Sequence, residues 1–572
     1  MIGAESKLVT KLEALYDKLE KEPLHPVWIS LVSSDKALAR AHEIENRLDL
    51  PLAGKTFAVK DNIDVAGMPT TAGCPAYAYT PQETATVVRR LENAGAVLIG
   101  KTNMDQFATG LVGTRSPYGA CSSVFDDRYI SGGSSSGSAV AVARGLADFS
   151  LGTDTAGSGR VPAAFNNLVG LKPTRGLLST QGVVPACRSL DCVSIFARSC
   201  REAYGVWNIA KAFDPADANS RQPRAGEGAS PWMNTTFRFG VPVPSQLEFF
   251  GDEEASQIYQ AAIRKLQQIG GEIIEIDFSP FHKAAALLYG GPWVAERLAA
   301  IRSFIHDHAD DTDPTVRSVI SGATKYTAAD VFEADYRLRE LCREAEQQWA
   351  DIDVLFLPTT GTIYTHEQIT ADPIHLNTNL GCYTNFVNLM DLAAVAVPAG
   401  FRSNGLPFGV SFIGRAFTDE ALLTLASRYL GEDGPPIKKP PRCIEIAVVG
   451  AHLSGQPLNH QLTARGARLQ RTCHTAPEYR LFALRECSPA KPGLVHQPAL
   501  KGPGIEVEVW SIPQDQFGSF VAEVPPPLTI GTVVLEDGES VKCFLCEPYA
   551  IVSAVEITQY GGWRAYLRSL KS

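Results

Sequence analysis

Two neighbouring stretches rich in serine and glycine carry the residues of this sequence that could do chemistry. The first, SGGSSSGSAVAVA, runs from Ser131 to Ala143, and the second, GTDTAGSGR, runs from Gly152 to Arg160. A flexible linker of this composition would be flanked by polar residues, whereas the first stretch continues into an apolar segment. Small residues let backbone N–H groups approach a ligand, and an activated serine hydroxyl is a nucleophile. We therefore expect a reactive serine here, with Ser134 and Ser158 as the candidates.

A lysine upstream of both stretches is the candidate base. Lys60 ends the short apolar run of FAVKD. Burial lowers the pKa of a lysine, because a low-dielectric environment disfavours the ammonium form. A neutral Lys60 could accept a proton from Ser158 if Ser134 relays it. The three residues before Ser158 offer consecutive N–H groups that can form a nest for a developing oxyanion.

Three other interpretations of the serine-rich stretch are open. Residues 133–137 match the G-x-S-x-G pattern of a nucleophile elbow, which requires an Asp or Glu and then a His later in the chain. No clear apolar strand leads into this segment, and no histidine lies between His42 and His282. A phosphate-binding loop would need a Lys followed by Ser or Thr after the glycines. A plain structural turn would explain the glycines but not the clustered hydroxyls.

The elements that must position these residues alternate between strand and helix. Residue patterns predict helices over 1–22, 84–95, 136–144, 252–269 and 419–430, and strands over 55–62, 96–103, 147–155, 238–244, 271–278, 353–358, 394–400 and 407–414. Helices dominate between the strand at 271–278 and about Trp349. Such alternation indicates an α/β domain with a largely parallel sheet.

A proline-rich segment, EDGPPIKKPPR at 432–442, divides the chain. After it the sequence is rich in β-branched and aromatic residues, as in GIEVEVWSI and ESVKCFLCEP. We predict a first domain over 1–431, a linker over 432–442 and a smaller, mostly β (α+β) domain over 443–572. A polar segment over 214–234 is predicted to be a surface loop.

The composition argues against several classes of function. The chain has 572 residues and a net charge of −10, with no basic stripe for a nucleic acid or an anionic membrane. Its longest apolar runs are about half of the roughly twenty residues that a membrane span needs. The N-terminal segment lacks the apolar core of a signal peptide. We therefore expect a cytoplasmic enzyme whose twelve cysteines are reduced.

Metal and cofactor sites are not indicated by the cysteine and histidine spacings. Cys543 and Cys546 form a lone C-x-x-C pair without the second pair or histidines of a zinc site. His306 and His308 have no supporting ligands nearby in the sequence. We expect no metal and no organic cofactor.

The motifs VKD, GGSSSGSA and GTDTAGSGR resemble those of the amidase-signature family over about residues 1–430. The resemblance implies a mixed sheet wrapped by helices. It also implies a catalytic triad in which Ser158 is the nucleophile, Ser134 is a bridging serine after a cis peptide, and Lys60 is the base. The implied oxyanion donors are the N–H groups of Thr155, Ala156, Gly157 and Ser158. Ala156 stands where glycine is common in the family, a change that leaves the N–H in place.

The second domain extends the resemblance to allophanate hydrolases. VVGAHLSGQPLNHQL, from Val448 to Leu462, is similar to their C-terminal domain, as are YRLFAL, KPGLV and VKCFLCEP. The resemblance implies that the first domain deaminates allophanate, which is urea-1-carboxylate, to N-carboxycarbamate. The second domain then promotes decarboxylation. His452 is implied as the residue for that step, and Asn459 as a further contact.

Recognition of the allophanate carboxylate requires a fixed cation, for which arginine is suited. LLYGGPWVAERL resembles the substrate segment of the family, with Tyr289 and Arg297 as the contacts. We expect Tyr289 to end one helix and Pro292 to begin the next. From the residues alone, a surface ion-pair residue is the favoured interpretation of Arg297, and the resemblance reverses this preference. Arg115, in GTRSPYG, is a second candidate for the anion.

The resemblance also implies partners and leaves alternatives open. It implies a functional link to a separate, biotin-dependent urea carboxylase, and we expect a homodimer. Another amidase, a glutamine amidotransferase component that needs partner proteins, and a non-catalytic binding protein are the alternatives. Activity of the purified chain alone on allophanate separates them.

Overall fold

The computed structural model of the chain describes residues 7–21, 26–45, 47, 49–223, 236–432, 443–484, 489–499 and 501–570. The described residues up to 222 and from 236 to 432 form one compact unit, and those from 443 onward form a second. Most of the predicted linker, 433–442, lies outside the described residues, as do 224–234 of the predicted loop and 1–6 and 22 of the predicted N-terminal helix. No helix in the described ranges is both long enough and apolar enough to cross a lipid bilayer.

The first unit consists of the following elements. Its α-helices are α1 (Lys7–Lys21), α2 (Ser34–Glu45), α3 (Thr86–Asn93), α4 (Ser136–Ala143), α5 (Val161–Phe165), α6 (Cys200–Ala210), α7 (Glu253–Gln268), α8 (Ser279–Gly290), α9 (Val294–Asp307), α10 (Pro314–Ser321), α11 (Ala328–Trp349), α12 (His366–Ala371), α13 (His375–Leu380), α14 (Asn385–Leu389) and α15 (Asp419–Leu430). Its strands are β1 (Trp28–Leu31), β2 (Thr56–Lys60), β3 (Val97–Thr102), β4 (Phe149–Asp154), β5 (Val169–Lys172), β6 (Cys192–Ala197), β7 (Phe237–Pro242), β8 (Gly271–Ile276), β9 (Val354–Pro358), β10 (Leu392–Phe401) and β11 (Pro407–Arg415).

These strands form one mixed sheet in the order β1-β3-β2-β4-β6-β5-β10-β11-β9-β7-β8. Strand β2 is parallel to β3 and β4, and β7 is parallel to β8 and β9, while the other pairs are antiparallel. The predicted mixed sheet wrapped by helices is confirmed. The largely parallel sheet expected from the strand–helix alternation is wrong, because β5–β6 and β10–β11 connect antiparallel neighbours without a crossover helix.

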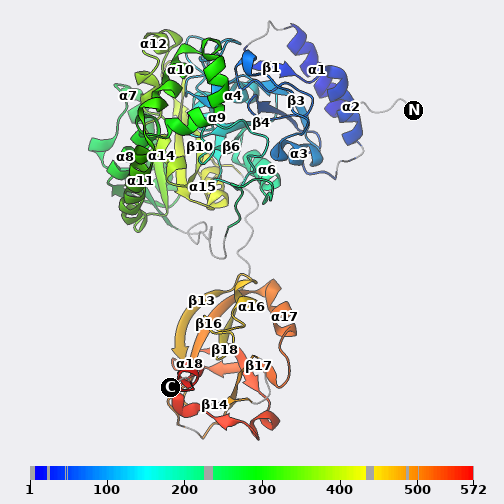
Figure 1. Ribbon diagram of the computed structural model, residues 1–572, viewed down its shortest axis with the longest axis vertical. Helices are drawn as coiled ribbons and strands as arrows, with labels where there is room; N and C mark the ends of the chain where they lie inside the picture. The colour runs from blue at the N-terminus through cyan, green and yellow to red at the C-terminus, as the bar shows by residue number, and fades with distance from the viewer. Residues whose placement is uncertain are drawn as a thin grey trace. The chain divides into compact units, whose positions relative to one another are not determined.

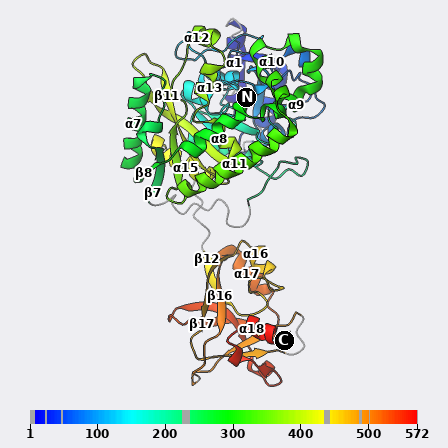
Figure 2. The ribbon, with the colours of Figure 1, turned by 60° about the vertical axis from the view of Figure 1, so that its left-hand side comes forward.

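The sheet is covered by helices on both faces, as Figures 1 and 2 show. Side chains alternate between the faces along each strand. Val354 and Phe356 of β9 belong to a core that also contains residues of α3, α6, α7 and α15. Leu355 and Leu357 belong to a second core, with residues of α8, α11 and α14. The apolar strands are therefore buried on both sides, as their nearly continuous apolar sequences indicate.

The second unit is mostly β structure, as predicted. Its strands are β12 (Cys443–Val448), β13 (Arg468–His474), β14 (Tyr479–Ala483), β15 (Pro492–His496), β16 (Glu506–Pro513), β17 (Leu528–Val534), β18 (Ser540–Cys546) and β19 (Val555–Glu556), and its α-helices are α16 (His460–Thr463), α17 (Gln514–Ala522) and α18 (Trp563–Ser569). Five strands form a sheet in the order β13-β16-β12-β18-β17, and three form a sheet in the order β15-β14-β19. Both sheets contribute to one apolar core.

Candidate active site

Three elements bring the predicted triad to one edge of the large sheet. Lys60 is the last residue of β2, and Ser158 lies in the turn after the adjacent parallel strand β4. Ser134 lies just before α4, a helix that packs on these strands. Ligand sites in such sheets form beyond the carboxyl ends of parallel strands. Lys60 and Ser134 are fully buried, and Ser158 is 2% exposed.

The three side chains form a continuous hydrogen-bonded chain. Lys60 Nζ donates to Ser134 Oγ at 2.7 Å, and Ser134 Oγ donates to Ser158 Oγ at 2.9 Å. The peptide bond before Ser134 is cis. Lys60 Nζ also donates to Thr153 Oγ1 at 2.8 Å. With the two hydroxyl hydrogens turned the other way, toward the amine, the same contacts provide a path for a proton from Ser158 to Lys60 without an imidazole.

The environment of Lys60 favours a neutral amine. Burial lowers the pKa of Lys60 to about 7, against the opposing effect of the buried carboxylates Asp105, Asp191 and Asp154. The positive charge of Arg297 lowers the pKa further. A lysine of this kind accepts a proton near neutral pH, as a general base must.

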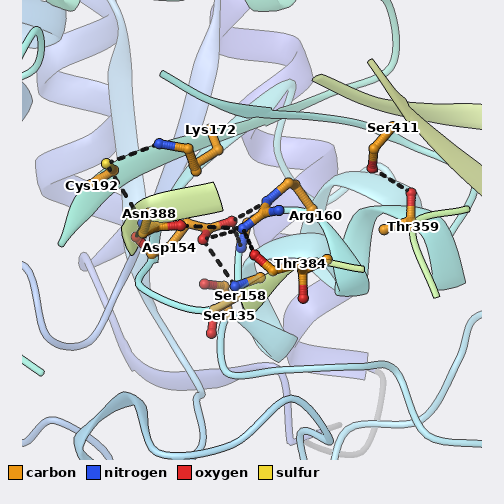
Figure 3. Close-up of polar contacts among 12 residues, drawn as sticks. Ser135, Asp154, Ser158, Arg160, Lys172, Cys192, Thr359, Thr384, Asn388 and Ser411 are labelled. Carbon is orange, nitrogen blue, oxygen red and sulfur yellow. Dashed lines mark hydrogen bonds and ion pairs between the residues drawn. The ribbon is translucent and has the colours of Figure 1, made fainter. Parts of the chain in front are cut away.

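A buried ion pair shapes the turn that carries Ser158 (Figure 3). The Asp154 carboxylate accepts hydrogen bonds from the N–H groups of Gly157 and Gly159, each at 3.0 Å. It also accepts two bonds from the Arg160 guanidinium, each at 2.9 Å. Burial acts to raise the pKa of Asp154, but the charge and hydrogen bonds of Arg160 hold it below the ordinary value. The carboxylate thus remains charged and holds both ends of the turn.

Residues at and just before α14, far along the chain, hydrogen-bond to this ion pair and its turn (Figure 3). Asn388, on α14, donates from Nδ2 to the Asp154 carbonyl oxygen at 2.8 Å. Arg160 Nη2 donates to Asn388 Oδ1 at 3.3 Å and to the Thr384 carbonyl oxygen at 3.1 Å. These residues are not among the site residues predicted from the sequence. Asp154 and Arg160 lie in the motif GTDTAGSGR and could have been found there, whereas nothing in the sequence singles out Asn388.

The same turn corrects the predicted set of oxyanion donors. The N–H of Gly157 is already donated to Asp154, so it is not free for a substrate oxygen. The N–H groups of Thr155, Ala156 and Ser158 meet no hydrogen-bond acceptor within the described part of the chain. Gly157 instead has a conformational role: its φ is +140°, and an added Cβ would lie 2.4 Å from Thr384 Oγ1.

The predicted substrate residues Tyr289 and Arg297 meet across a helix break. Tyr289 lies near the end of α8 and Arg297 in the next helix, α9, which begins at Val294. Arg297 Nη2 donates to the Tyr289 hydroxyl oxygen at 3.1 Å. Arg297 is 2% exposed, so it is not a surface ion-pair residue. Its Nε has no hydrogen-bond partner among the described residues, which leaves a buried donor for an anion.

Arg115 lies near this pair in a cavity of about 460 Å³. The cavity is also lined by Tyr289, Asn377 and Asn385. Arg115 Nη1 donates to the Thr109 carbonyl oxygen at 3.0 Å, and Arg297 Nη1 donates to the Thr109 hydroxyl at 3.1 Å. The two arginines therefore share Thr109 as a partner, which brings their positive charges near each other.

His452, in the second unit, lies in the loop between β12 and α16. Its Nε2 is 2.7 Å from Gln461 Oε1, and its ring stacks on Phe544 with centroids 4.9 Å apart and an interplanar angle of 11°. Burial lowers the pKa of His452. Asn459 Nδ2 donates to the His452 carbonyl oxygen at 2.8 Å. Its amide thus holds the loop of His452, and a contact between Asn459 and a substrate stays a prediction.

A buried carboxylate holds the next part of this loop. Glu508, on β16, accepts hydrogen bonds from Ser454 N at 2.8 Å and from Trp510 Nε1 at 3.1 Å. Arg564, on α18, donates to Glu508 at 2.5 Å and to the Ser454 carbonyl oxygen at 2.9 Å. The loop of His452 is thereby tied to both the central sheet and the last described helix.

The histidines and cysteines considered for metal binding lie apart. Cys543 and Cys546 are buried on β18, and His306 and His308 each lie beside an aspartate at the surface. No group of three or more His, Cys, Asp or Glu within the described ranges is arranged to hold a metal ion.

Comparison with known proteins relates each unit to a family. The family model named Amidase matches residues 11–423, and the model named Allophanate hydrolase C-terminal domain matches residues 444–568. A crystal structure of Kluyveromyces lactis allophanate hydrolase is 43% identical, with a TM-score of 0.73, and the match covers 99% of this chain and 97% of that one.

Two groups of curated relatives differ in how much of them the chain covers. Urea amidolyase of Saccharomyces cerevisiae is 45% identical over 98% of this chain, but the match covers 32% of the relative. The chain thus spans about a third of the length of these relatives. A glutamyl-tRNA(Gln) amidotransferase subunit from Synechococcus elongatus is 32% identical over 75% of this chain and 95% of the relative.

Proposed function

We propose that this chain, which belongs to the amidase family, converts allophanate to ammonia and CO2 in two steps. The observation that carries the proposal is the hydrogen-bonded chain from Lys60 through Ser134 to Ser158, built around a lysine whose pKa is about 7. The match of residues 444–568 to the Allophanate hydrolase C-terminal domain supports the choice of substrate. We assign the first step to residues 1–431 and the second to residues 443–572.

In the first step, Ser158 attacks the terminal amide carbonyl of allophanate. Neutral Lys60 accepts a proton from Ser134 as Ser134 accepts one from Ser158. The N–H groups of Thr155, Ala156 and Ser158 stabilise the oxyanion. The proton then passes to the leaving nitrogen, ammonia departs, and water hydrolyses the acyl-enzyme to N-carboxycarbamate.

The carboxylate of allophanate is bound by the cationic side of the site. Arg297 and Tyr289 present a guanidinium and a hydroxyl that already contact each other, and Arg115 adds a second positive charge. Guanidinium groups pair with carboxylates through directional, charge-assisted hydrogen bonds. This group of residues selects a small amide that carries an anion.

In the second step, His452 promotes the loss of CO2 from N-carboxycarbamate. The remaining carbamate decomposes to ammonia and CO2 without further catalysis. The supporting features are the lowered pKa of the imidazole and its fixed position against Phe544.

The chain would act after a reaction that carboxylates urea. We assign it to the cytoplasm, as a homodimer, with a functional link to a biotin-dependent urea carboxylase. The relation to yeast urea amidolyases, of which the chain spans about a third, supports that link.

A component of a glutamine amidotransferase is the second candidate. The similarity to the glutamyl-tRNA(Gln) amidotransferase relative supports it. That match covers 75% of this chain, whereas the match to the allophanate hydrolase structure covers 99%. The broader match favours allophanate as the substrate.

The test is product analysis with the purified full chain. Ammonia release from allophanate should occur without a partner protein, and Ser158→Ala should reduce it by about 10⁴-fold or more, as for other catalytic nucleophiles. His452→Ala should keep the first ammonia release but let N-carboxycarbamate accumulate, seen by ¹³C NMR. Release of ammonia from glutamine, with allophanate untouched, would instead establish the amidotransferase alternative.

A further inference from the structure

We propose that Gln461 is a positioning residue that makes Nδ1 of His452 the nitrogen that delivers a proton to the substrate. The inference rests on the proposed decarboxylation step, and it adds a residue and an atom to that step. Gln461 is the second residue of α16, directly after the loop that holds His452.

The hydrogen bond to Gln461 determines the tautomer of the imidazole. His452 Nε2 lies 2.7 Å from Gln461 Oε1, and an amide oxygen only accepts hydrogen bonds. Nε2 must therefore carry a hydrogen, which leaves the lone pair of the neutral ring on Nδ1. No residue in the described part of the chain bonds to Nδ1, so that this nitrogen is open to exchange a proton.

Aromatic packing keeps the ring in this orientation. Phe544 stacks on one face of the imidazole, and Phe520 meets it edge-on with centroids 5.4 Å apart and an interplanar angle of 73°. Asn459 holds the backbone of His452 through its carbonyl oxygen. Rotation of the ring by half a turn would exchange each nitrogen with a ring carbon, so that Cε1 would replace Nε2 at Gln461 and the hydrogen bond would be lost.

The proposed step requires a proton donor at the substrate nitrogen. In N-carboxycarbamate, the bond between the nitrogen and one carboxylate carbon breaks, and its electron pair passes to the nitrogen. CO2 leaves, and Nδ1–H of the imidazolium gives its proton to that nitrogen, which yields carbamate. Nδ1 then recovers a proton from water. Throughout, Nε2–H stays bonded to Gln461.

The charges around His452 are few and of mixed sign. Lys491 and His460 act to lower the pKa of His452, while Glu523 acts to raise it. Glu523 is itself paired with Arg465, which lies over the Phe520 ring. Burial is the largest influence and disfavours the imidazolium. A carboxylate at position 461 would therefore be the dominant local charge.

Two substitutions separate the hydrogen bond from the charge. Gln461→Glu keeps an acceptor at Nε2 and adds a negative charge, which should move the pH at which decarboxylation declines upward by about one unit or more. Gln461→Met keeps the length of the side chain but removes the acceptor, and it should slow decarboxylation by about tenfold or more at every pH. Wild-type rates and pH profiles in both variants would overturn the proposal.

The tautomer can be read independently of activity. In the full chain labelled with ¹⁵N-histidine, the signals lost in His452→Ala identify this ring. Above its pKa, we expect a protonated Nε2 and a bare Nδ1; the reverse pattern would contradict the assignment.

Ammonia release from allophanate in the same samples is the internal control. Release of the first ammonia, which accompanies formation of N-carboxycarbamate, should be unchanged in both Gln461 variants, because the first step uses Lys60, Ser134 and Ser158. The second ammonia follows decarboxylation and should be delayed with it. If His452→Ala decarboxylates normally, the proposed second step fails. If His452→Ala stalls while both Gln461 variants behave as the wild type, only the inference about Gln461 fails.

Discussion

The two proposed sites, around Lys60 and His452, hold their candidate proton-transfer groups by different means. Lys60 is fully buried, beside a turn that is fixed by the buried ion pair of Asp154 and Arg160. His452 is half-buried, between aromatic rings and one amide. The ordinary pKa of lysine is 10.5, so its amine must lose nearly all contact with water to be neutral near pH 7. Histidine starts at 6.5 and needs only a shallow site.

The largest expected effect follows from replacing Lys60. Lys60→Met should reduce ammonia release from allophanate by about 10⁴-fold or more, because no other basic side chain among the described residues hydrogen-bonds to Ser134 Oγ. Lys60→Arg should fail similarly, since arginine stays protonated. Initial rates of ammonia release measure this, with the melting temperature as the folding control. Activity of Lys60→Met above about 1% of the wild type would contradict this prediction, because a buried neutral lysine would then not be required for the first step.

An intermediate effect is expected at the turn before Ser158. Gly157→Ala places a Cβ against Thr384 at a φ of +140°, so the turn must shift. We expect kcat for ammonia release to fall by about 10²-fold. Ala156→Gly is the matched control and should change kcat by only a few-fold, since it removes a methyl group and keeps the N–H. Equal effects of the two substitutions would mean that this turn is not held rigidly.

The smallest effect is a difference in pH dependence between the two steps. Lys60 must be neutral, so kcat/KM for ammonia release should fall about tenfold per pH unit below pH 7 and level off above it. His452 must be protonated, so decarboxylation should decline as pH rises through its lowered pKa. Stopped-flow assays of ammonia and CO2 over a range of about three pH units around neutrality would show the opposite trends. If both steps had the same pH profile, a single titrating group would control them, and the difference between the two sites would not hold.

Much of the first site could be predicted because its chemistry is concentrated in short motifs. Lys60, Ser134 and Ser158 are of reactive types and lie at strand and helix ends, where the chain order alone places them at one edge. Tyr289 and Arg297 could also be placed, since the break between their helices is visible as Gly290, Gly291 and Pro292.

The parts that could not be predicted depend on contacts between distant segments. Whether the N–H of Gly157 is free depends on the side-chain orientation of Asp154, which the residue order does not determine. Asn388 reaches that carboxylate only because α14 packs near the turn. The antiparallel pairing of β5 with β6 was missed for the same reason, since a loop of irregular structure joins them.

The position of Arg564 has a practical consequence for dissecting this protein. Its guanidinium joins Glu508 of the central sheet to Ser454, close to His452. An excised second unit that stops before Trp563 would lose these hydrogen bonds. The Glu508 carboxylate, which is 2% exposed, would then have no counter-charge from Arg564. Expression fragments should therefore retain α18, because trimming this helix would remove the guanidinium that holds the loop of His452.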